Sequence, residues 1–306
     1  MTGGRTCAPD PAGAVRRRVM RAGVACLLAP LGAQAQERFS LFVGSPQHTV
    51  DRMVRMARLR DGDVVVDLGA GDGRVVLSAL RAHPGVRGWG VDINPELVRE
   101  ATANAKELGL SDRAQFFHRN VFDADLGQVS VVNMWLFPEL MRLLRPKILS
   151  EARPGTRIVS NGFDMGSWEP DETDTEGSRV LLWIVPAPVA GYWSWELPIA
   201  GEAQRFEAVL EQRFQVIDGI VRVGPRRGLL EQPRLRGEDI AFTLEMTLAR
   251  GGLVRQSYSG RVRGSRIDGT VEVTLRDADD RRLVLPWQAA RTATTGYFRP
   301  TGQEAK

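Results

Sequence analysis

Two acidic residues and three glycines have the types and spacing of a nucleoside-binding site. The run DLGAGDG contains Asp67, Gly69, Gly71 and Gly73, and Asp92 follows later in the chain. Glycines let a backbone turn tightly and approach a ligand closely, and a carboxylate can accept hydrogen bonds from both hydroxyls of a ribose. A tight turn without a ligand is the plainer alternative. The combination of glycine loop and acid favours a bound nucleoside.

The elements around the loop have the order needed to position it. An apolar run at 63–68 predicts a buried strand before the loop, and helix-forming residues follow at 74–82. Further strands are predicted at 88–93, 114–118, 129–135, 156–161 and 180–185, with helices between them, including one at 138–152. Strands that alternate with helices predict an α/β fold with a Rossmann-like, doubly wound, mainly parallel sheet. Such a sheet binds its ligand at the carboxyl ends of its strands.

With an acid before Gly-x-Gly-x-Gly and a second acid after the next strand, the chain resembles the class I S-adenosylmethionine-dependent methyltransferases. The resemblance implies S-adenosyl-L-methionine as cofactor, with the glycine loop under its methionine part and Asp92 on its ribose. Where this family usually has Gly-Asp after the third strand, the chain has Arg119-Asn120. The resemblance implies a contact between Asn120 and the adenine, and a simple turn residue is the alternative.

The run VVNMWLFPE, which ends at Glu139, is similar to the branch of the ATP synthase c-subunit lysine methyltransferases. With the segment FDMGSWEPD at 163–171, the chain resembles the exported bacterial members of this branch more closely still. This resemblance implies in-line methyl transfer to an amine such as a protein lysine, and it suggests Asn133, Trp135, Pro138 and Glu139 as catalytic candidates. Asn133 would orient the amine, Trp135 would wall the pocket and Glu139 would attract a cation. The alternatives are that Trp135 packs in the core and that Glu139 is a first-turn helix charge that interacts with the helix dipole.

Residues after the fifth predicted strand give a second, weaker group of candidates. Asp164, Trp168 and Asp171 would lie at the ligand edge of the sheet, as a lid or as a wall for the acceptor. The stretch EPDETDTE at 169–176 is interpreted instead as a solvated acidic loop.

The first 35 residues predict an export signal. They combine an arginine-rich start, an apolar stretch too short to span a bilayer and an Ala-x-Ala site. They also hold both cysteines and the whole basic surplus of the 41 basic over the 37 acidic residues. We therefore expect an exported, periplasmic protein without a transmembrane span, or a cytoplasmic one if the segment is not a signal. The three histidines lack ligand-like spacing, so no metal site is expected.

The pattern changes after a proline-rich stretch at 186–188. The predicted domains are the signal peptide (1–35), the methyltransferase domain (36–188) and an antiparallel β accessory domain (189–298), built as a barrel or sandwich. Its predicted strands lie at 206–214, 217–223, 239–248, 253–262, 267–275 and 282–289. Tyr192, Trp193 and Trp195 are expected to precede this sheet and close one end. Its role is acceptor recognition, binding of an apolar ligand, or packing alone.

Two functions from different classes explain these features. The first is an exported methyltransferase whose acceptor is unknown. The second is a non-catalytic envelope protein that keeps the fold and binds a nucleoside or another small ligand, because S-adenosylmethionine is made in the cytoplasm. Nucleic acid is not an expected partner, since the chain without residues 1–35 has balanced charge.

Overall fold

The computed structural model describes residues 44–249, 252–275 and 281–294. The predicted signal at 1–35 lies outside them. The described chain forms two sheets, one of seven strands and one of nine. Within these ranges, none of the helices is both long and apolar enough to cross a membrane.

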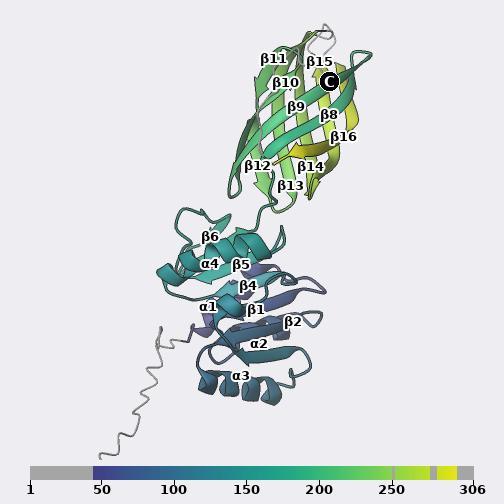
Figure 1. The fold of residues 1–306 in the computed structure, drawn as a ribbon. Coiled ribbons are helices and arrows are strands. Elements are labelled where there is room, and N and C mark those ends of the chain that lie inside the picture. Colours follow the sequence, from purple (N-terminus) through teal and green to yellow (C-terminus); the bar gives the residue numbers. More distant parts are fainter. Residues whose placement is uncertain (1–43, 250–251, 276–280, 295–306) are drawn as a thin grey trace, which may run out of the picture. The chain divides into compact units, whose positions relative to one another are not determined.

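The seven-stranded sheet has the order β3-β2-β1-β4-β5-β7-β6 and a parallel core (Figure 1). Its elements are α1 (Gln47–Ala57), β1 (Val64–Leu68), α2 (Arg74–Ala82), β2 (Arg87–Asp92), α3 (Pro95–Glu107), β3 (Ala114–His118), η1 (Val121–Asp123), β4 (Val131–Met134), α4 (Pro138–Glu151), β5 (Arg157–Asn161), β6 (Glu172–Asp174) and β7 (Val180–Ile184). The predicted α/β fold is confirmed, and β7 runs antiparallel to both of its neighbours, β5 and β6.

Alternate residues of the central strands enter two separate cores. Val65, Val131 and Val159 pack with α1 and α2 on one face. Val66, Val132 and Ile158 pack with α4 on the other. Strands covered on both faces are apolar along their whole length, which explains the continuous apolar runs in the sequence.

The strand order reverses between β1 and β4. β1 runs beside β2 on one side and beside β4 on the other, and the chain visits β2 and β3 before it returns to β4. Loops after β1 and β4 therefore diverge to opposite sides of the sheet, and the space between them is where open α/β sheets bind ligands. The glycine loop and Asn133 lie at this point.

The second sheet is antiparallel and barrel-like (Figure 1). Its order is β11-β10-β9-β8-β16-β15-β14-β13-β12, and the edge strand β11 also lies against β13, so the sheet curls nearly closed. The strands are β8 (Gly191–Ile199), β9 (Glu202–Arg213), β10 (Val216–Val223), β11 (Arg226–Leu229), β12 (Glu231–Arg236), β13 (Asp239–Leu248), β14 (Gly252–Arg263), β15 (Arg266–Leu275) and β16 (Arg281–Ala293).

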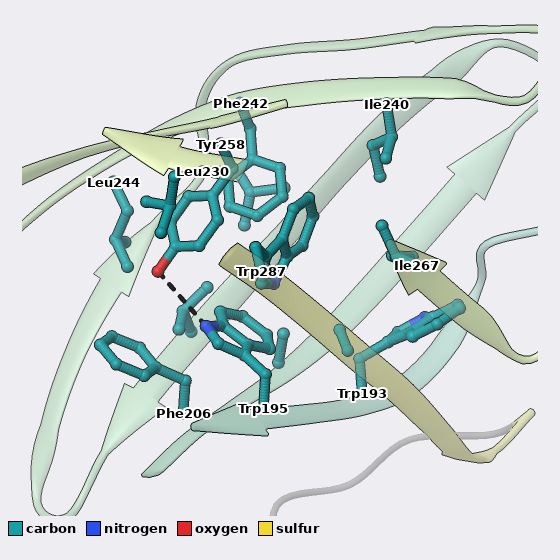
Figure 2. Close-up of a cluster of buried hydrophobic side chains, with 14 of the residues drawn as sticks. Trp193, Trp195, Phe206, Leu230, Ile240, Phe242, Leu244, Tyr258, Ile267 and Trp287 are labelled. Carbon is teal, nitrogen blue, oxygen red and sulfur yellow. Dashed lines mark hydrogen bonds between the residues drawn. The ribbon is translucent and has the colours of Figure 1, made fainter. Parts of the chain in front are cut away.

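Aromatic side chains fill the interior of this barrel-like sheet (Figure 2). Trp195 stacks on Phe206 with ring centroids 5.4 Å apart, and the ring of Tyr258 lies 4.9 Å from that of Trp287. The indole nitrogen of Trp195 donates a hydrogen bond to the Tyr258 hydroxyl at 3.3 Å. The expectation that Tyr192, Trp193 and Trp195 precede the sheet was wrong, because all three belong to β8, where both tryptophans are buried.

Two glycines in this domain allow neighbouring strands to approach closely. Gly219 and Gly269 lie inside β10 and β15 in regular register. A Cβ at Gly269 would lie 2.1 Å from the Ser259 carbonyl oxygen, and one at Gly219 would lie 2.6 Å from that of Val209. Glycine is needed there because the neighbouring strand approaches too closely for a side chain.

Candidate active site

The glycine loop joins β1 to α2 in a conformation that favours glycine. Gly69, Gly71 and Gly73 have φ of 87°, 54° and 81°. A Cβ at Gly69 would lie 2.8 Å from the Leu136 side chain, which comes from the segment after β4. The amides of Gly69 and Ala70 both donate to the Val91 carbonyl at 2.9 Å, which fixes the loop to β2. The result is a tight backbone cradle at the carboxyl end of β1.

Asp92 binds this loop as well as facing the ligand edge. One of its carboxylate oxygens accepts the Gly71 amide at 2.9 Å, and the other accepts the Asn94 amide at 2.8 Å. A carboxylate has about four lone-pair positions, so acceptor capacity remains for ribose hydroxyls. The same side chain thus shapes the loop and can bind the sugar.

Asp67 is a buried acid at the end of β1. It is 4% exposed, and among the described residues no hydrogen bond forms to its carboxylate. Burial, followed by the charges of Asp92 and Asp72, raises its pKa well above the ordinary value. A cationic group beside it would favour the ionised form. The buried, unpaired acid and the glycine cradle fit the ammonium-bearing methionine part of S-adenosylmethionine.

Asn120 lies at the other end of the expected cofactor position. It caps η1, and its carboxamide oxygen accepts the Phe122 amide at 3.1 Å. The amide NH₂ group remains available to an adenine nitrogen. Asn120 therefore acts as a turn residue in this structure, and its contact with adenine stays a prediction.

The four catalytic candidates around the end of β4 fall into different environments. Asn133 is 3% exposed and lies directly beside Asp67 in the parallel register. Trp135 and Pro138 are half-buried at the edge of the sheet. Glu139 has 76% of its side chain exposed in the first turn of α4, 3.9 Å from Arg142. Its position agrees with the helix-dipole interpretation.

The second group of candidates falls into different environments. Trp168 is fully buried in the α4-side core, where its ring centroid lies 6.3 Å from that of Trp183. Asp164 and Asp171 bind backbone amides of Gly166 and Ile184. The acidic stretch is also not simply solvated, because Glu172 and Asp174 form β6 and pair with Arg58 and Arg52.

Sequence reasoning missed two residues that the fold brings to this edge. Arg74 pairs with Asp72 through contacts of 2.5–2.9 Å and donates to the Ser45 carbonyl at 2.9 Å. Asn161 ends β5 and donates to the Ser45 hydroxyl at 3.2 Å. Asn161 could have been noticed, since it follows a core strand as Asp92 does. In the described ranges, no group of three or more acidic or histidine residues has a metal-binding arrangement.

Comparisons with known proteins identify the family of this chain. The model of the ANTKMT methyltransferase domain matches residues 67–172. A protein-lysine N-methyltransferase of Saccharolobus islandicus is 38% identical over 131 residues, which cover 43% of this chain and 81% of the relative. The adenine nucleotide translocase lysine N-methyltransferase of Mus musculus is 33% identical, with 45% of this chain and 59% of the relative covered.

Two further matches are a second mouse enzyme and a solved bacterial structure. The ATP synthase c-subunit lysine N-methyltransferase of Mus musculus is 34% identical, and the match covers 44% of this chain and 54% of the relative. The chain thus spans just over half the length of each mouse relative. An RNA methyltransferase of Salinibacter ruber, solved with S-adenosyl-L-homocysteine, has 44% identity and a TM-score of 0.47, with 48% of this chain and 96% of that one covered. The chain belongs to the family of the archaeal protein-lysine N-methyltransferase, and it is an S-adenosylmethionine-dependent methyltransferase.

Proposed function

We propose that this methyltransferase acts on a lysine amine of a protein. The observation that carries the proposal is membership in the family of a protein-lysine N-methyltransferase, matched over 81% of that relative's length. The two mouse relatives are also named as lysine N-methyltransferases. The position of Asn133 supports it, because a buried carboxamide next to the cofactor edge suits an amine.

The site has to receive the amine in its neutral form. When bound, S-adenosylmethionine supplies an electrophilic methyl group on a sulfonium sulfur. A free lysine has a pKa near 10.4, and desolvation lowers it. Leu136 is buried and Trp135 half-buried beside Asn133, so this edge can desolvate an amine. A carboxamide orients the nitrogen lone pair without stabilising the ammonium ion as a carboxylate would.

Incubation with tritium-labelled S-adenosylmethionine and envelope extract tests this function. We expect labelled methyl groups on protein lysines, identified by mass spectrometry. Asp92→Asn should lower the rate at least tenfold through weaker cofactor binding, and Asp112→Asn, at an exposed site, should leave it unchanged. Label found in RNA, or in no macromolecule despite cofactor binding, would contradict the proposal.

We also propose export to the periplasm, supported by the arginine-rich, apolar and Ala-x-Ala order of residues 1–35. Fractionation of cells that produce the full chain should place a shortened protein in the periplasm. A cytoplasmic protein of full length would contradict export and leave the methyltransferase assignment intact.

A further inference from the structure

Three polar side chains lie on one face of the sheet at its ligand edge. Asp67 pairs with Asn133 in the parallel register, and Asn133 pairs with Val159, two residues before Asn161. Side chains two residues apart on a strand share a face. Asp67, Asn133 and Asn161 therefore lie on the face of Val65, Val131 and Val159, across the neighbouring strands β1, β4 and β5.

Asn161 has an unusual hydrogen-bonding state. It is 2% exposed, and its NH₂ group donates to the Ser45 hydroxyl. Its carboxamide oxygen is buried and has no hydrogen-bond partner among the described residues. A buried polar atom without a partner costs about 1–3 kcal/mol, so such atoms in native proteins call for an explanation.

The neighbours of Asn161 are the candidates for the acceptor pocket. A Cβ at the next residue, Gly162, would lie 3.9 Å from the indole nitrogen of Trp135. Trp135 follows Asn133 by two residues, so the ends of β4 and β5 approach each other here. Asn161 thus ends β5 one residue before Gly162, which lies close to Trp135, and the core of α4 is on the opposite face.

We propose that the Asn161 carboxamide oxygen accepts a hydrogen bond from the acceptor amine and, with Asn133, orients it for methyl transfer. This inference rests on the proposed amine acceptor. Two neutral carboxamides can hold the N–H groups of an amine while its lone pair stays free for the methyl group. A carboxylate at the same position would raise the amine pKa and keep the nitrogen protonated.

Binding of two cofactor analogues to the full chain tests this contact without a known acceptor. S-adenosylhomocysteine lacks the transferable methyl group, and sinefungin carries an amine in its place. Calorimetry should show that Asn161→Ala lowers the preference for sinefungin over S-adenosylhomocysteine about tenfold, as expected for loss of one hydrogen bond to a charged group. Affinity for S-adenosylhomocysteine should stay within about twofold.

Ser45→Ala is the matched control, because it removes the hydrogen-bond partner of Asn161 and keeps the free oxygen. It should leave the sinefungin preference unchanged. Asn161→Asp keeps an acceptor oxygen and should preserve or increase the preference for sinefungin. This variant tests the contact if the alanine variant does not fold. An unchanged preference in Asn161→Ala, or an equal loss in Ser45→Ala, would overturn the proposal. Failure of the folded wild type to bind either analogue would instead contradict the methyltransferase function.

Discussion

Asp67 and Asp92 carry the same carboxylate in two different environments. Asp92 accepts two backbone amides, whereas Asp67 is buried without a partner among the residues that the structure describes. The pKa of Asp67 is therefore raised, by burial first and then by the neighbouring charges of Asp92 and Asp72. The ionised form of Asp67 is therefore unfavourable for the folded state until a cation binds beside it.

We expect Asp67→Asn to stabilise the ligand-free protein at pH 7 and to have little effect near pH 3. Below its ordinary pKa of 3.8, Asp67 is protonated in the folded and unfolded chain alike. As the pH rises, the unfolded chain releases this proton first, so the free energy of unfolding falls until the folded carboxyl ionises. Urea unfolding at both pH values measures the difference. An equal effect at pH 3 and pH 7 would argue against burial as the cause.

The same substitution should weaken cofactor binding. Loss of the charge opposite a cationic group is expected to lower the affinity for S-adenosylmethionine about 10- to 100-fold at pH 7. Calorimetric titration gives the affinity, and Asp112→Asn is the control at an exposed carboxylate. Unchanged affinity would show that Asp67 does not face the methionine ammonium.

At the scale of elements, Arg74 connects the glycine loop to the segment before α1. It pairs with Asp72 in the loop and donates to the Ser45 carbonyl. The hydrogen bond to Asp72 raises the pKa of Arg74, so the guanidinium keeps its charge. Gly44 packs on this side chain, since a Cβ there would lie 2.8 Å from the guanidinium carbon. One arginine thus orders two segments of the site.

Arg74→Ala should lower the affinity for S-adenosylmethionine about 3- to 10-fold, because the loop and the Ser45 segment lose a shared anchor. The expected effect is modest, since more than a third of the side chain is exposed. Arg81→Ala, in the last turn of the same helix, is the control and should bind normally. Equal affinities of the two variants in calorimetry would contradict the anchoring role.

At the scale of the whole molecule, the two sheets have separate cores. The barrel-like sheet encloses its own aromatic cluster, and among the residues that the structure describes this cluster shares no buried residue with the cores of the seven-stranded sheet. The chain between the sheets is also ordered. Gln212 accepts a hydrogen bond from the Val189 amide at 2.7 Å and donates one to the Ala187 carbonyl at 3.0 Å.

Trp287→Ala should destabilise the barrel-like sheet by about 3–5 kcal/mol, because it leaves a cavity among packed rings. Affinity for S-adenosylmethionine at room temperature should not change, since the cofactor site has its own core. Denaturant unfolding and calorimetry measure the two quantities. Val284→Ala, at an exposed position, is the control for the unfolding experiment. A parallel loss of cofactor affinity would show that the cores are coupled.

Local signals were sufficient for the cofactor half of the site. Apolar runs, glycines with positive φ and acids at strand ends act within a few residues, so the sequence predicted the parallel sheet, the loop and Asp92. The same reasoning missed β8, although Trp193, Trp195, Leu197 and Ile199 alternate, because the aromatic residues were expected to close one end of the sheet. It also missed β11 and β12, which are short.

The sequence by itself determined the methyltransferase fold, the glycine cradle and the cofactor. Only the tertiary structure decided that Trp168 belongs to the core, that the acidic stretch pairs with arginines of and after α1, and that Asn161 lies with Asn133 at one edge. The physical reason is the long separation in sequence between the residues that make these contacts. Asn161 and Ser45 are 116 residues apart, and Arg52 and Asp174 are 122 apart. Such contacts follow from strand order and register, which no local pattern contains.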